Sequence, residues 1–320
     1  MKRLGGFFEL EPGRRSRGYH ERATALCSGR ACLRLMLETR RPRRALVPFF
    51  LCDSALSAFD AAQVPYGFYR VTPSLEAVLP EPFEGADCVL YVNYFGLKTR
   101  AVRALESAVP AWIIADDTQA FFERGYARAA SFNSARKFFG VPDGAYAYGE
   151  NIGAAPETRL DETGYQHLVN RLMGHQELAY RQFVEHERAM TTEVRGPSRL
   201  AEQLLAGIDY DRARDARRRN YVAVHERLAP ANRLAADLVL PDAAVPFCYP
   251  LLPVKPLDRQ RLWRQQIFVS HLWPEVETRP GDGFDWEREL AGGLLPLPID
   301  QRYDLSDMDR LCTAVLEELR

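Results

Sequence analysis

One lysine of this chain lies in a segment whose residue types suit covalent amine chemistry. Lys137 is one of four lysines, against thirty-eight arginines, and it follows Asp116 by twenty-one residues. A lysine amine can form an imine with an aldehyde, whereas the guanidinium of arginine stays protonated and is a poor nucleophile. A carboxylate facing a pyridine nitrogen would keep that nitrogen protonated, so that the ring could accept the electrons of a carbanion. The pair therefore predicts chemistry with pyridoxal 5'-phosphate.

A third element upstream suits the phosphate group of such a cofactor. Ser28-Gly-Arg-Ala-Cys-Leu33 predicts a tight turn that opens an apolar helix, and the first amides of that helix, at Gly29, Arg30 and Ala31, could hold a phosphate. Gly29 would let the backbone approach the phosphate closely. A cation at Arg30 would oppose the helix dipole by about 0.3–1 kcal/mol. An anion beside Arg30 would offset that cost, unless the side chain simply extends into solvent.

The order of these elements resembles the DegT/StrS-type sugar aminotransferases, which are pyridoxal phosphate enzymes of fold type I. Their Ser-Gly-Thr-Ala-Ala-Leu turn is similar to residues 28–33, and their Ile-Glu-Asp-Ala-Ala-Gln is similar to Ile114-Ala-Asp-Asp-Thr-Gln119. Their lysine, followed by Gly-Glu-Gly-Gly, is similar to residues 137–145. The likeness extends to Leu295-Pro-Leu-Pro-Ile299 and the last helix, so it covers nearly the whole chain. Gly5-Gly-Phe-Phe-Glu-Leu10 is also similar to a less characterised subgroup.

The resemblance implies roles for single residues. Lys137 would hold the cofactor as an imine, and Asp116 would face the pyridine nitrogen, with Asp117 as its rival if the register shifts by one. Gln119 would meet the phenolic oxygen of the cofactor.

The remaining cofactor contacts follow the family spacing less closely. Ser131 is the nearer counterpart of the family's phosphate-binding serine, while Ser134 has the spacing found in aspartate-aminotransferase-like enzymes. The residue expected to stack on the ring would be Cys52, which cannot stack. Phe50 or Phe49 is therefore expected to replace it, although core packing is the alternative for both.

Helical and extended segments alternate from residue 29, which predicts an α/β fold with a largely parallel central sheet flanked by helices. Asn93 and Asp116 would lie at the ends of strands that point in the same direction, at the sheet edge where ligands bind. The expected helices are 29–40, 53–62 and 99–107, and the expected strands are 44–49, 66–71, 87–93, 111–116, 129–133 and 145–148.

The second half of the chain predicts two long helices and a small C-terminal lobe. The helices would span 160–190 and 198–228. After them, short apolar stretches predict a small α+β lobe that ends in a helix with Ser306 as its N-cap. We divide the chain into a large cofactor domain, residues 1–190, and a small domain, residues 191–320.

Composition excludes several classes of partner. The net charge of -1 gives no field that would draw nucleic acid or acidic lipid, and the arginines of 40–44 and 212–219 are expected to form solvated faces. The six cysteines have no metal-site spacing and are expected to be buried free thiols. The sequence has neither a signal-peptide pattern nor a run of eighteen apolar residues. The cytoplasm is therefore the expected location.

The resemblance implies an aminotransferase that moves an amino group from glutamate or glutamine to a nucleotide-linked keto sugar, for surface polysaccharide or secondary metabolites. Some members of the family are dehydratases with histidine in place of the lysine, and Lys137 argues against that activity. Residues 134–137 also fit the Ser-x-x-Lys of penicillin-binding acyl enzymes, but the other motifs are in the wrong order. A cofactor-binding sensor remains an alternative. Enzymes of this fold commonly place their sites at a homodimer interface, so we expect a homodimer.

Overall fold

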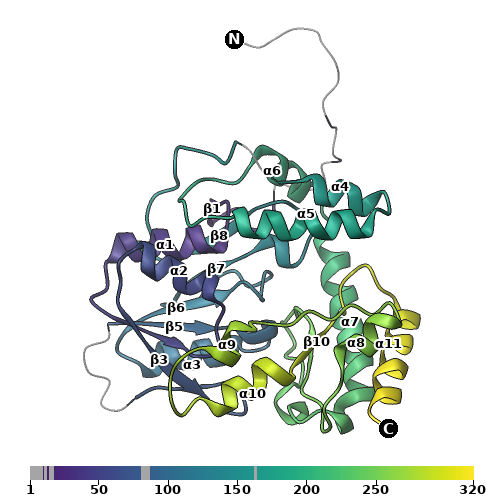
Figure 1. Cartoon of the computed structure of the whole chain (residues 1–320). Helices are drawn as coiled ribbons and strands as arrows, with labels where there is room; N and C mark the ends of the chain where they lie inside the picture. The colour runs from purple at the N-terminus through teal and green to yellow at the C-terminus, as the bar shows by residue number, and fades with distance from the viewer. Residues whose placement is uncertain (1–9, 11–12, 14–17, 81–86, 162–163) are drawn as a thin grey trace, which may run out of the picture.

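An eight-stranded sheet forms the centre of the described part of the chain (Figure 1). The computed structural model describes residues 10, 13, 18–80, 87–161 and 164–320, so residues 5–9 of the Gly5–Leu10 motif lie outside it. In spatial order the strands are β1 (Thr24–Leu26), β8 (Ala145–Tyr148), β7 (Ala130–Asn133), β6 (Trp112–Asp117), β5 (Cys88–Val92), β2 (Ala45–Pro48), β3 (Tyr66–Val71) and β4 (Ala77–Val78).

The middle strands of this sheet are parallel, and its margins are antiparallel. The neighbouring pairs from β7 through β6, β5 and β2 to β3 run parallel. In contrast, β8 runs antiparallel to β7 and β1, and β4 runs antiparallel to β3. Every residue of β2 and β5 is buried, as expected for parallel strands that helices cover on both faces. The predicted largely parallel α/β fold is confirmed.

Three helices of the first half cover the sheet as the apolar periodicity predicts. α1 (Gly29–Arg40) and α2 (Asp53–Ala61) lie on one side of the sheet, and α3 (Thr99–Ala108) lies on the other (Figure 1). The hydroxyl of Ser28 caps α1 by accepting a 3.1 Å hydrogen bond from the amide of Ala31. Such a cap stabilises a helix by about 1 kcal/mol. Helix α1 therefore begins at the predicted residue.

The two long helices predicted for the second half are wrong, because each is divided into two. The first is α4 (Gln166–Leu172) and α5 (Gln176–Ala189), separated at Gly174, whose φ of +88° does not fit a helix. The second is α6 (Arg199–Ala206) and α7 (Tyr210–Leu228), separated at Gly207. Asp209 then caps α7 by accepting a 3.0 Å hydrogen bond from the amide of Arg212.

The C-terminal part contains a two-stranded antiparallel sheet, three short helices and a longer final helix. Asp304, not the predicted Ser306, caps the last helix, because the side chains of Asp304 and Asp307 form a reciprocal capping box there. The 3₁₀ turns in the described part of the chain are η1 (Tyr94–Gly96), η2 (Ala135–Lys137), η3 (Ala229–Ala231) and η4 (Ala235–Asp237). The other elements are β9 (Tyr249–Leu251), β10 (Leu295–Leu297), α8 (Arg259–Arg264), α9 (Glu275–Thr278), α10 (Asp285–Gly293) and α11 (Leu305–Glu318).

Helix α7 belongs to both hydrophobic clusters that the described residues form. Its first turns pack with Phe121 and Phe138 in a small aromatic cluster, and its last turns, including Tyr221 and Val224, pack in the main core. Arg217 lies between these two parts and is only 2% exposed. The expectation that residues 212–219 form a solvated face is therefore wrong for Arg217, whose guanidinium donates to buried carbonyls.

Five of the six free cysteines are buried, which confirms most of that expectation, and Cys52 is half-buried. Among the residues that the structure describes, no helix is long and apolar enough to cross a membrane. Nor do the described residues contain a group of three or more histidine, cysteine, aspartate or glutamate side chains that could hold a metal ion.

Candidate functional site

Thr118 connects the candidate amine to the candidate carboxylate. Lys137 lies in η2, directly after β7, and its Nζ donates a 2.9 Å hydrogen bond to Oγ1 of Thr118. Thr118 follows β6, and its amide donates a 2.9 Å hydrogen bond to Oδ1 of Asp116. Because β6 and β7 are adjacent and parallel, their carboxyl ends meet at one edge of the sheet. Thr118 was not predicted from the motifs, although its position between two predicted cofactor contacts, Asp116 and Gln119, indicates a place in the site.

The two neighbouring aspartates have different surroundings, because successive side chains of a strand point to opposite faces. Asp117 Oδ1 accepts hydrogen bonds from Asn93 Nδ2 at 2.9 Å and from the Tyr126 hydroxyl at 2.8 Å. Burial raises the pKa of Asp117 well above its usual value. Each carboxylate has one oxygen, Oδ2, without a donor among the described residues. The two differ in the other oxygen: that of Asp117 is held by Asn93 and Tyr126, whereas that of Asp116 accepts only from the amide of Thr118 in its own turn.

Gln119 offers a buried donor to the same edge. Its Oε1 accepts a 2.7 Å hydrogen bond from the amide of Phe95, which fixes the orientation of the side-chain amide. Its Nε2 is buried and has no partner within the described part of the chain. A buried donor without an acceptor costs about 1–3 kcal/mol, so an acceptor atom on a bound molecule would be stabilising here.

The predicted phosphate turn packs directly against Thr118. A Cβ atom at Gly29 would lie 3.1 Å from Cγ2 of Thr118, so only glycine fits there without a shift. The amide of Ala31 already donates to the hydroxyl of Ser28. A phosphate would therefore bind the two amides that precede it in the helix, those of Gly29 and Arg30.

Arg30 does not extend into solvent. Its Nη1 donates a 2.6 Å hydrogen bond to the carbonyl of Met190, and its Nη2 lies 4.0 Å from a carboxylate oxygen of Glu187. Arg136 also pairs with Glu187. The end of α5 is thereby attached to the start of α1 through Arg30 and to η2 through Arg136.

The other predicted residues are near the same edge but make no described contact with Thr118. Ser131 is buried in β7 opposite Ala115, and Ser134 is half-buried just before η2. The ring of Phe50 has no exposed surface, because it stacks on Tyr94 at 5.6 Å and meets Trp273 edge-on at 4.7 Å. Phe50 is therefore packed in the core.

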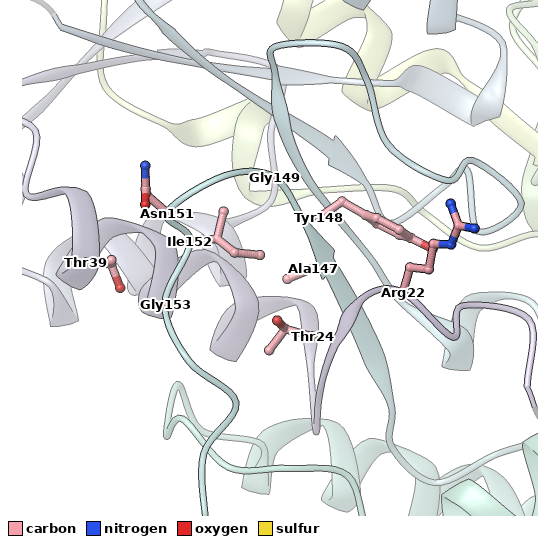
Figure 2. Close-up of a pocket in the computed structure, with 9 residues that line it drawn as sticks. All are labelled: Arg22, Thr24, Thr39, Ala147, Tyr148, Gly149, Asn151, Ile152 and Gly153. Atoms are coloured by element: carbon pink, nitrogen blue, oxygen red, sulfur yellow. The ribbon is translucent and has the colours of Figure 1, made fainter.

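A cavity of about 460 Å³ lies elsewhere, at the margin of the sheet formed by β1 and β8 (Figure 2). Figure 2 shows Tyr148 extending toward Arg22 on one side, with Thr39 and Asn151 on the other. Its lining contains neither a lysine nor a carboxylate. This cavity cannot supply imine chemistry.

No family model matches the sequence, and no curated protein is significantly similar to it. Solved structures do match. A DegT DnrJ EryC1 StrS aminotransferase from Brucella abortus is 16% identical, with a TM-score of 0.65 over 93% of this chain and 86% of that one. The chain has the fold of the DegT-type aminotransferases.

Two further structures agree with this assignment of the fold. DesV of S. venezuelae, in complex with a ketimine intermediate, is 19% identical, with a TM-score of 0.62 over 93% of this chain and 85% of that one. The sugar aminotransferase CalS13 from Micromonospora echinospora is 14% identical, with a TM-score of 0.63 over 92% and 87%. The fold predicted from the sequence motifs is confirmed.

Proposed function

We propose that this chain is a pyridoxal-phosphate-dependent aminotransferase that acts on a keto sugar. The observation that carries the proposal is that Thr118 binds both the amine of Lys137 and the carboxylate of Asp116, at the ligand-binding edge of an aminotransferase fold. The names of DesV and CalS13 support a sugar as substrate. We keep a nucleotide-linked keto sugar as the acceptor and glutamate or glutamine as the donor.

The described residues fit the cofactor. Asp116 has an oxygen available for a protonated ring nitrogen, and the free Nε2 of Gln119 suits a phenolic oxygen. Gly29 lies close to Thr118 and has no side chain, so a phosphate could reach the backbone amides at the N-terminus of α1. Lys137 is half-buried, so its amine is reachable.

When bound, the cofactor supplies an aldehyde for imine formation and a ring that withdraws electrons from a substrate carbon. Lys137 would hold it covalently and, once displaced by the donor amine, would act as general acid and base at the substrate carbon. Thr118 orients that amine by accepting its hydrogen bond. Asp116 would keep the ring nitrogen protonated, and Gln119 would fix the ring by donating to its oxygen.

Borohydride reduction followed by peptide mapping tests the proposal. The purified protein should be yellow, with an absorbance band at roughly 410–430 nm, and the reduced cofactor should be found on Lys137. Lys137→Ala should abolish the covalent product, while Lys98→Ala, the matched control at another half-buried lysine, should retain it. Reduced cofactor on Lys98 or Lys255 would disprove the assignment. Cofactor binding without release of a keto acid from glutamate or glutamine would identify a sensor instead.

We also propose that the enzyme is a homodimer. Among the described residues, seven of the fifteen exposed large hydrophobic side chains lie on the hairpin of α4 and α5, with Leu172 88% and Met173 64% exposed. A concentration of exposed apolar side chains on one hairpin is typical of an interface. The same hairpin ends at Glu187 and Met190, which contact Arg30 and Arg136 beside the site. A second copy covering this hairpin would therefore lie next to the site.

A further inference from the structure

Two side chains from the C-terminal half hold the carbonyl of the residue next to Lys137. The carbonyl oxygen of Phe138 accepts a 2.8 Å hydrogen bond from Nε2 of Gln301 and a 3.3 Å hydrogen bond from Nη2 of Arg217. The two side chains are also joined, because Nε of Arg217 donates to Oε1 of Gln301 at 2.9 Å. Phe138 ends the turn η2, which contains Lys137.

All three nitrogens of the Arg217 guanidinium donate hydrogen bonds within this arrangement. It lies 4.4 Å from the centre of the Phe138 ring, and its Nη1 donates to the carbonyls of Pro246 and Phe247 at 3.3 and 3.0 Å. Burial lowers the pKa of Arg217 to about 10. Burying a guanidinium is costly unless its donors are satisfied.

We propose that Arg217 and Gln301 are positioning residues for Lys137, a role in catalysis that rests on the function proposed above. By holding the Phe138 carbonyl, they fix the short turn η2 and keep Nζ of Lys137 on Thr118. A single 3₁₀ turn has few hydrogen bonds of its own. Its orientation therefore depends on outside contacts, and small misplacements of a catalytic group reduce the rate strongly.

Three variants separate this role from general packing. Gln301→Glu keeps an acceptor for Arg217 but removes the donor to Phe138, and Gln301 is only half-buried, so the fold should survive. Arg217→Lys keeps the charge but loses the fixed fork of donors. Arg218→Lys is the matched control, because Arg218 is on the same helix and also binds carbonyls, those of Pro241 and Ala244, away from η2.

The first measurement uses the cofactor-free protein. Lysines are labelled with trace acetic anhydride, and mass spectrometry compares Lys137 with Lys98 and Lys255. Gln301→Glu and Arg217→Lys should change the relative labelling of Lys137 by about threefold to tenfold, the range expected from one lost hydrogen bond, and Arg218→Lys should leave it unchanged. The second measurement is the pH midpoint of the cofactor absorbance band, which should move in the first two variants only.

Unchanged labelling of Lys137 in a folded Gln301→Glu protein overturns the proposal. If Arg217→Lys does not fold, Gln301→Glu alone decides. If the parent protein binds no cofactor, the proposed function fails, whereas the labelling still reports whether these residues position the amine. If the cofactor binds and the labelling does not respond, the positioning role fails and the proposed function stands.

Discussion

The amine of Lys137 lies 2.9 Å from the hydroxyl of Thr118, a residue that also binds Asp116 through its amide. One threonine therefore sets the positions of two groups that approach from neighbouring strands. The methyl group of the same threonine is the atom that a side chain at Gly29 would meet first. Thr118 thus touches all three elements that the sequence motifs define.

Replacing Thr118 by valine should slow the half-reaction with donor by about tenfold to a hundredfold, because Lys137 would lose the acceptor that orients it. Stopped-flow absorbance of the cofactor band measures this rate. Thr118→Ser keeps the hydroxyl and serves as the control, so it should retain most of the activity. A Thr118→Val enzyme as fast as the parent would show that the hydrogen bond has no catalytic role.

Asp116→Asn should leave the fold intact and reduce the rate of the half-reaction by about a hundredfold to a thousandfold, because the ring nitrogen would lose its charged partner. Single-turnover kinetics with glutamate or glutamine measure the effect. Asp117→Asn is the register control. If Asp117→Asn is the inactive variant and Asp116→Asn is active, the two roles must be exchanged.

Asp117 should make the stability of the protein depend on pH. The pKa of Asp117 is raised in the folded state. Its contribution to the stability of the fold is therefore fully present below the ordinary pKa of 3.8, and it is lost as the pH rises through the pKa of the folded state. Asp117→Asn cannot ionise, and its free energy of unfolding should therefore fall less than that of the parent between about pH 4 and pH 8. Denaturant titrations across this range give the comparison. Parallel curves for the two proteins would contradict a raised pKa.

Charged substitutions on the hairpin of α4 and α5 should weaken the proposed dimer. Leu172→Glu with Met173→Glu places two carboxylates on the most exposed apolar surface, and sedimentation velocity should then show a monomer. Val254→Glu, at a 56% exposed site elsewhere, is the matched control and should remain dimeric. Pyridoxal phosphate should favour the dimer by mass action. A parent monomer that keeps full cofactor occupancy at low micromolar concentration would argue against a shared site.

Local patterns in the sequence predicted most of the large sheet. Strands such as β5 are apolar at every position and end at polar residues, and α1 carries both its cap at Ser28 and its apolar stripe in contiguous sequence. The strands that were missed, β1 and β4, have three and two residues, too few to produce a pattern. The cap of α11 was misassigned because Asp304 and Ser306 are both good capping residues.

The candidate site was predictable as a set of motifs but not as a set of contacts. Lys137, Asp116 and Gln119 were found because each has a distinctive type and spacing. The burial of Arg217 was not, because its neighbours in sequence are charged and the carbonyls that it binds are about thirty and eighty residues away. The ring of Phe50 was expected to stack on the cofactor. It packs instead against Tyr94 and Trp273, which are distant in sequence and contact it only in the folded chain.

The short strand β1 has a consequence for how the chain is made. Thr24 pairs with Ala147, so the chain must grow by 123 residues, the difference of those numbers, before the partner strand exists. At a synthesis rate of about 5–20 residues per second, β1 waits about 6–25 s on the ribosome. During that interval the backbone groups of residues 24–26 have no strand partner, so β1 is an unpaired template. Mispairing between nascent chains should therefore begin at this margin, and a chaperone that binds early would act on residues 24–26.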